Sequence, residues 1–139
     1  MDDPMLLKPG LYRRDGTDER PDCPALLGGV CACGYLFFPF QRFGCERCGS
    51  LDLQPKALAG AGRLLAVARV HLHTGKGREA PFTVGSIKLD DGPIVRTLVE
   101  GDEARLREGA SVVTTLARVT DPEGAPCLDL RFTPRGAYP

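Results

Sequence analysis

The chain has 139 residues, 42% of them hydrophobic, and its 18 basic and 18 acidic side chains give a formal net charge of zero. This length suffices for one ordinary domain, or for one small domain with a metal-stapled appendage. A balanced charge lacks the long-range attraction typical of nucleic-acid binding, so it favours a protein partner or a small, locally recognised ligand.

The amino-terminal segment, residues 1–24, is rich in proline, glycine and charge and has only short apolar stretches. Such a composition cannot form its own core, so we predict an extended arm that lies on another part of the molecule. The acidic start has neither the basic nor the apolar region of a signal peptide, and no run approaches the roughly 18 apolar residues of a membrane span. We therefore expect a cytoplasmic protein without membrane contact.

Four cysteines follow in two tight pairs, Cys31-Ala-Cys33 and Cys45-Glu-Arg-Cys48. Thiols stay reduced in the cytoplasm, so this spacing indicates a metal site rather than disulfides. Two facing cysteine turns supply the four donors of a tetrahedral Zn²⁺ ion, which predicts a rubredoxin-like zinc ribbon over residues 25–54. A closed four-thiolate site leaves no open position for a substrate, so we expect a structural metal, with a rubredoxin-type iron centre as the alternative.

Two features near these cysteines bear on the ribbon. Gly34 and Gly49 each follow the second cysteine of a pair, where the chain often needs a positive φ. Cys23 is either a stray thiol or a fifth ligand candidate. A ribbon this small cannot bury every aromatic ring it contains, so we expect the rings to share in a partner interface, with a core of the ribbon itself as the alternative. These rings are Tyr35, Phe37, Phe38, Phe40 and Phe43.

From residue 55 to residue 139 the pattern has period two, which is typical of strands with one buried face. Five strands are expected, at about 60–73, 81–89, 94–99, 111–119 and 127–132, with a short helical turn between glycines 101 and 109. Five strands with a helical element between the third and fourth is the order of an OB-fold barrel. In the first strand, the predicted buried face carries Leu64, Ala66, Ala68, Val70 and Leu72. The opposite face carries Arg63, Arg69, His71 and His73.

Few residues outside the cysteine pairs suggest chemistry. Lys76 and Arg78 lie on a glycine-spaced loop that suits the capture of a phosphate such as those of coenzyme A, with a plain solubilising loop as the alternative. His71 and His73 lack a third donor, so a second metal site is not expected. The pair Asp90-Asp91 is typical of a turn, and Cys127 of a small core residue. No motif of independent catalysis is present, so we expect no catalytic residues in this chain.

The ribbon from Gly29 to Ser50, with Phe37-Phe38-Pro39 between the cysteine pairs and an OB-like barrel after it, resembles a known family. It is similar to the zinc-ribbon and OB-fold acyl-CoA-associated proteins, long catalogued as a domain of unknown function. Three strings in the barrel support the likeness: Gly62-Arg63-Leu64-Leu65, Pro81-Phe82-Thr83-Val84-Gly85 and Leu89-Asp90-Asp91-Gly92-Pro93.

The chain departs from the family's usual pattern in two ways. Most members have two residues between the first pair of cysteines, whereas one residue separates Cys31 from Cys33. A helical hairpin usually precedes the ribbon in the family, and no such hairpin is expected in this chain. The short form is similar to that of members that accompany thiolases, including the small subunits of benzoylsuccinyl-CoA thiolases of anaerobic toluene breakdown.

The resemblance implies an accessory subunit of a heteromeric acyl-CoA thiolase. Its thiolase-fold partner, a dimer on which the hetero-oligomer is built, would supply the catalytic cysteine. This chain would bind Zn²⁺, stabilise the partner and help form the site for coenzyme A or acyl-CoA. Two alternatives are a nucleic-acid-binding module, which zero net charge disfavours, and a stand-alone acyl-CoA-binding protein.

Overall fold

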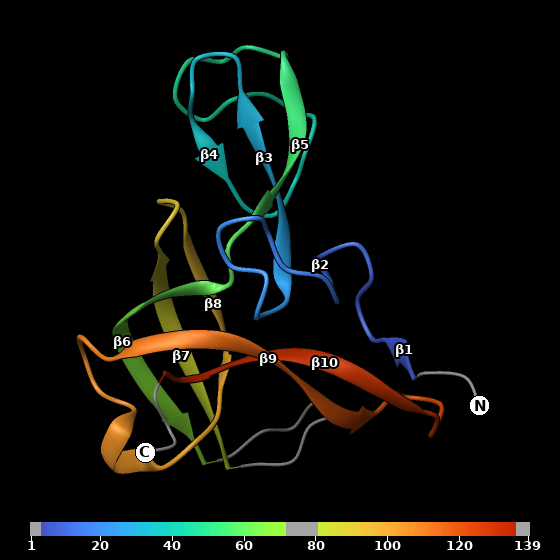
Figure 1. Cartoon of the computed structure of the whole chain (residues 1–139), viewed down its shortest axis with the longest axis vertical. Helices are drawn as coiled ribbons and strands as arrows, with labels where there is room; N and C mark the ends of the chain where they lie inside the picture. Colours follow the sequence, from blue (N-terminus) through green and yellow to red (C-terminus); the bar gives the residue numbers. More distant parts are fainter. Residues whose placement is uncertain (1–3, 72–80, 136–139) are drawn as a thin grey trace.

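The structure is a computed structural model that describes residues 4–71 and 81–135. Figure 1 shows a small sheet above a β-barrel, with the arm running between them. In the described residues, strands predominate and the helical content is one short 3-10 helix. The small sheet contains β2 (Tyr12–Arg13), β3 (Ala25–Cys31), β4 (Leu36–Phe37) and β5 (Leu53–Leu58).

The barrel closes in the order β6-β7-β8-β10-β9 and back to β6. Its strands are β6 (Ala61–Val70), β7 (Phe82–Leu89), β8 (Ile94–Val99), β9 (Ser111–Thr120) and β10 (Pro126–Pro134). Neighbours pair antiparallel except β8 and β10, which meet in parallel through Val99 and Phe132. The 3-10 helix Glu103–Arg105 lies between β8 and β9, and the Asp102 carboxylate accepts a hydrogen bond from the Ala104 N–H to cap it. The predicted mainly β fold, a ribbon followed by a five-stranded OB barrel, is confirmed.

The first barrel strand differs from its predicted pattern because it contains a β-bulge. The register of β6 against β7 shifts between Leu64 and Ala66. A bulge exchanges the two faces of a strand beyond it. Arg69 therefore pairs with the buried Thr83 and shares its face, while Ala66 and Ala68 are exposed. The predicted buried face was right at Leu64 and wrong at Ala66 and Ala68.

The arm crosses from the barrel to the small sheet (Figure 1). Its first strand, β1 (Met5–Leu6), adds to β10 in parallel, and β2 pairs with β3. Tyr12 in β2 is 3% exposed, and its hydroxyl donates to the buried Asp129 carboxylate at 2.8 Å. Burial and this carboxylate raise the pKa of Tyr12 to about 12, so the hydroxyl stays a donor at neutral pH. A buried polar contact thus fastens the arm to β10.

The small sheet and the barrel share one hydrophobic core. Leu26 of β3 and Leu58 of β5 pack in the same cluster as Leu64, Ile87 and Phe132 of the barrel. A second, smaller cluster lies within the ribbon. The base of the ribbon is therefore part of the barrel's core, and its tip is stabilised separately.

Three contacts hold the junction between β5 and β6. Gly60 lies so close to the Pro24 carbonyl and the Thr114 side chain that an added Cβ would lie 2.3 and 2.2 Å from them. The Thr114 hydroxyl donates to the Pro24 carbonyl at 2.6 Å. The Asp91 carboxylate accepts from the Ala59 N–H at 2.8 Å, so this turn residue also anchors the junction. The predicted boundary between the ribbon and the barrel, after residue 54, falls inside β5 and stays a prediction.

Within residues 4–71 and 81–135, no helix is long and apolar enough to cross a membrane.

We expect Tyr12→Phe to lower the free energy of unfolding by about 1–3 kcal/mol, because the buried Asp129 carboxylate loses a donor. Urea unfolding followed by circular dichroism measures the change. Tyr35→Phe is the control, since the Tyr35 hydroxyl has no hydrogen-bond partner in the described part of the chain. Equal losses in the two variants would contradict the role given to Tyr12.

Candidate functional site

The four paired cysteines converge at the tip of the ribbon. Their sulfur atoms all lie within 4.8 Å of one another. The Sγ atoms of Cys31 and Cys48 are 3.6 Å apart, and those of Cys33 and Cys45 are 3.8 Å apart. Thiolates at about 2.3 Å from a tetrahedral ion lie about 3.8 Å from each other, so the spacing fits one metal ion. The four residues can therefore hold a metal ion as a closed set of donors.

The backbone around each pair turns to present its sulfur atoms. Gly34 and Gly49 have φ of 97° and 79°, which confirms the predicted left-handed turns. The Cys45 sulfur accepts N–H groups of Arg47 and Cys48 at 3.3 and 3.4 Å. Such donors stabilise a thiolate over a thiol, which is the form that binds metal.

The environment favours thiolates at two of the four cysteines. The backbone N–H of Tyr35 and the guanidinium of Arg47 lower the pKa of Cys33 to about 6. Although desolvation opposes ionisation of Cys45, the N–H groups of Cys48 and Arg47 lower its pKa. Although the N–H of Cys33 favours ionisation of Cys31, desolvation and the neighbouring sulfurs raise the pKa of Cys31 to about 12. Ionisation of all four sulfurs therefore needs a cation to offset their mutual repulsion.

The remaining cysteines and histidines lie outside this cluster. Among described residues, the group that could hold a metal comprises the four paired cysteines and does not include Cys23. Cys23 is buried and its thiol lies 3.4 Å from the Gly60 carbonyl. Cys127 is buried as expected of a core residue. His71 is exposed, and His73 lies outside the described residues.

The predicted interface aromatics occupy three different settings. Phe37 is buried in the ribbon's own core, with Tyr35 and Phe40 stacked on either side at 6.3 and 6.1 Å between ring centroids. Phe38 packs instead against the barrel cluster. Phe43 is 92% exposed. Phe37 thus follows the alternative, a core of the ribbon, whereas Phe43 is free to meet a partner and its interface role stays a prediction.

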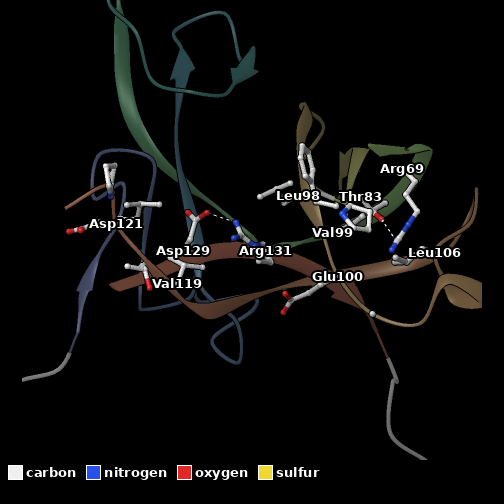
Figure 2. A pocket seen from close by; sticks show the side chains of 16 residues that line it. Arg69, Thr83, Leu98, Val99, Glu100, Leu106, Val119, Asp121, Asp129 and Arg131 are labelled. Atoms are coloured by element: carbon white, nitrogen blue, oxygen red, sulfur yellow. Dashed lines mark hydrogen bonds and ion pairs between the residues drawn. The ribbon is translucent and has the colours of Figure 1, made fainter. Parts of the chain in front are cut away.

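Sequence patterns did not reveal a cleft of about 1000 Å³ in the barrel, lined by the ends of β6, β8 and β9, the start of β7 and the middle of β10. It lies beside the seam where β8 and β10 pair through one residue each, so the strands diverge on either side. Figure 2 shows Arg69 with Thr83 at one side of the cleft and Asp129 with Arg131 at the other. The bulge in β6 turns Arg69 toward this cleft. The pattern of apolar residues did not predict this bulge.

Both arginines that line the cleft form ion pairs. Arg69 lies 3.2 Å from the Thr83 hydroxyl and 2.9 Å from the Glu103 carboxylate. Arg131 forms an ion pair with Asp129. The lining also includes the carboxylates of Glu100 and Asp121. Two guanidinium groups therefore face three lining carboxylates, which suits a polar ligand segment better than a bare phosphate.

The predicted phosphate contacts Lys76 and Arg78 lie outside the described residues. Among the described residues, Arg69 precedes them in the sequence and Pro81 follows them. Both of these residues line the cleft.

We expect the purified chain to contain one metal ion, and Cys45→Ser to abolish its retention because a buried donor is removed. Inductively coupled plasma mass spectrometry gives the metal content. Cys127→Ala is the matched control, since Cys127 is also buried but lies outside the cluster. Metal loss in the control alone would contradict the assignment.

Comparison with known proteins connects this architecture to a family. Residues 55–117 match the family described as the C-terminal OB-fold domain of ChsH2. A solved structure titled "Ltp2-ChsH2(DUF35) aldolase" contains a chain 27% identical to this one, with a TM-score of 0.63, and the match covers 79% of this chain and 84% of that chain. No curated protein matches. The family match and the structural match together relate this chain to the ChsH2 (DUF35) proteins and their OB-fold domain.

Proposed function

We propose that this chain is a non-catalytic accessory subunit of a heteromeric acyl-CoA enzyme that makes or breaks a carbon–carbon bond. The observation that carries the proposal is the likeness to a chain of the Ltp2-ChsH2(DUF35) aldolase, whose title names two components. The likeness covers 79% of this chain, whereas residues 55–139 make up 85 of 139 residues, or about 61%. It therefore includes part of the arm or the ribbon as well as the barrel.

The partner in this proposal is a thiolase-fold subunit that supplies the catalytic cysteine. Thiolysis and retro-aldol cleavage both break a carbon–carbon bond of an acyl-CoA. The short first cysteine pair favours the thiolase type, with benzoylsuccinyl-CoA as the substrate to test first. The structural match favours an aldolase as the second candidate. In either enzyme this chain orders the complex, and we expect it to work in the cytoplasm.

The proposed metal is a structural Zn²⁺ ion held by Cys31, Cys33, Cys45 and Cys48. When bound, Zn²⁺ supplies a fixed tetrahedral centre that crosslinks the two cysteine turns and has no open position for a substrate. The sulfur spacing supports this proposal, because it matches that of a four-thiolate site. The ribbon then keeps Phe43 and its surroundings in a defined shape for the partner.

The barrel cleft is the proposed place where this chain helps to bind the acyl-CoA. The described lining has mixed charge and hydrogen-bonding groups, which suit the neutral amides of the pantetheine arm. Lys76 and Arg78 lie in the sequence between the cleft residues Arg69 and Pro81, and their positive charges suit the phosphates of the same ligand. In the proposed complex, the partner subunit would close the cleft.

The nucleic-acid alternative finds less support on the barrel. Phe132 is fully buried and Phe82 is half-buried, so the described barrel strands offer no exposed ring for base stacking. Salt-dependent binding to a single-stranded oligonucleotide at micromolar affinity would favour that alternative.

We expect the chain to co-purify with a co-expressed thiolase-fold protein encoded by an adjacent gene, and the pair to be far more active than the partner alone. The assay compares coenzyme A-dependent thiolysis of benzoylsuccinyl-CoA with coenzyme A-independent aldehyde or ketone release from a β-hydroxyacyl-CoA. Full activity of the partner alone would refute the accessory role, and the substrate cleaved decides between thiolase and aldolase.

In the active pair, we expect Lys76→Ala with Arg78→Ala to raise the KM for the coenzyme A ligand about tenfold with little change in kcat, because phosphate contacts contribute to binding and not to the chemical step. Lys56→Ala with Arg118→Ala removes the same charge from exposed positions on β5 and β9 and serves as the control. An unchanged KM in the loop variant would refute the phosphate contact.

A further inference from the structure

The two cysteine turns differ in how many backbone donors they provide. In the longer turn, the Cys45 sulfur accepts two N–H groups, from Arg47 at 3.3 Å and Cys48 at 3.4 Å. In the shorter turn, the Cys31 sulfur accepts one N–H, from Cys33 at 3.5 Å. One residue fewer between the cysteines means one peptide N–H fewer that can reach the sulfur. The first sulfur of the short turn therefore has one backbone donor fewer, while its second sulfur, that of Cys33, receives the N–H of Tyr35.

The side chain of Arg47 reaches across from the longer turn to the shorter one. Its Nη2 atom lies 2.7 Å from the Cys33 carbonyl oxygen and 3.4 Å from the Cys33 sulfur. The guanidinium carbon also lies 5.6 Å from the centroid of the Tyr35 ring, within range of a cation–π contact. Three contacts to the segment Cys33–Tyr35 thus hold the guanidinium over an exposed sulfur.

We propose that Arg47 is an outer-sphere positioning residue of the metal site, which adds a side-chain donor from the longer turn to the Cys33 sulfur of the shorter turn. The inference rests on the proposed zinc site. A divalent ion with four thiolates carries a net charge of about −2, and the guanidinium offsets part of it at Cys33, one of the two exposed cysteines of the cluster. Arg47 also covers Cys33, where a competing chelator or proton would start to displace the metal.

The test compares Arg47→Ala with Arg42→Ala, a matched control. Arg42 is an exposed arginine of the same ribbon and stacks on Phe40 at 4.8 Å, so it makes an aromatic contact without touching a sulfur. Zinc transfer from the purified chain to a chromophoric chelator gives the rate of release. We expect Arg47→Ala to accelerate release about tenfold, Arg47→Lys to lie between it and the parent, and Arg42→Ala to match the parent.

Substitution of Co²⁺ for zinc gives a second readout, which a purely structural role would not move. A hydrogen bond lowers the energy of the sulfur electrons, so its loss in Arg47→Ala should shift the thiolate-to-cobalt charge-transfer band to longer wavelength. The far-ultraviolet circular dichroism spectrum should stay unchanged, because Arg47 is exposed.

The outcomes separate this inference from the zinc proposal. A parent chain that holds no metal overturns both. A parent chain that holds zinc, with Arg47→Ala matching it in release rate and in cobalt spectrum, overturns the role of Arg47 and leaves the zinc site standing. Faster release in Arg42→Ala to the same extent also overturns it, because any surface charge would then suffice.

Discussion

The convergence of four cysteine sulfurs is the constraint on which the ribbon depends. The ribbon's own core contains four buried residues, Cys31, Phe37, Cys45 and Leu53, and two of them are cysteines of this cluster. So little apolar surface cannot by itself offset the conformational entropy of ordering the two cysteine turns. The proposed metal ion would crosslink the turns, supply the missing stabilisation and relieve repulsion among the sulfurs. Because the stacked rings of Tyr35, Phe37 and Phe40 pack beside the turns, their arrangement depends on the same centre.

The base of the ribbon depends instead on the barrel. Leu26 and Leu58 enter the barrel's core, and the close approach at Gly60 fixes the path of the chain between them. The arm reinforces this arrangement, since Tyr12 meets Asp129 on β10. The same Asp129 pairs with Arg131 and lines the cleft. One buried carboxylate thus connects the arm, the barrel wall and the proposed ligand site, so a change in the arm would be felt in the cleft.

The separate positions of the cysteine cluster and the cleft suit the proposed accessory role. The tip of the ribbon presents an exposed Phe43 beside the four cysteines, and the barrel presents a cleft with two arginines. In the proposed accessory role, another protein completes both surfaces, in keeping with the likeness to a chain of the Ltp2-ChsH2(DUF35) aldolase.

The cysteine spacing, the glycines after each pair and the period-two pattern were enough to predict a ribbon, its left-handed turns and an OB barrel, because metal ligation and strand alternation are local rules. Other features needed the tertiary structure. The bulge at Leu64–Ala66 is set by pairing with β7, so residue spacing alone placed Ala66 and Ala68 on the wrong face. The burial of Phe37 and the exposure of Phe43 depend on how the loop folds back over the ribbon. The approach of Arg47 to Cys33 and of Tyr12 to Asp129 joins residues 14 and 117 positions apart, and such contacts arise only when separate turns and strands pack together.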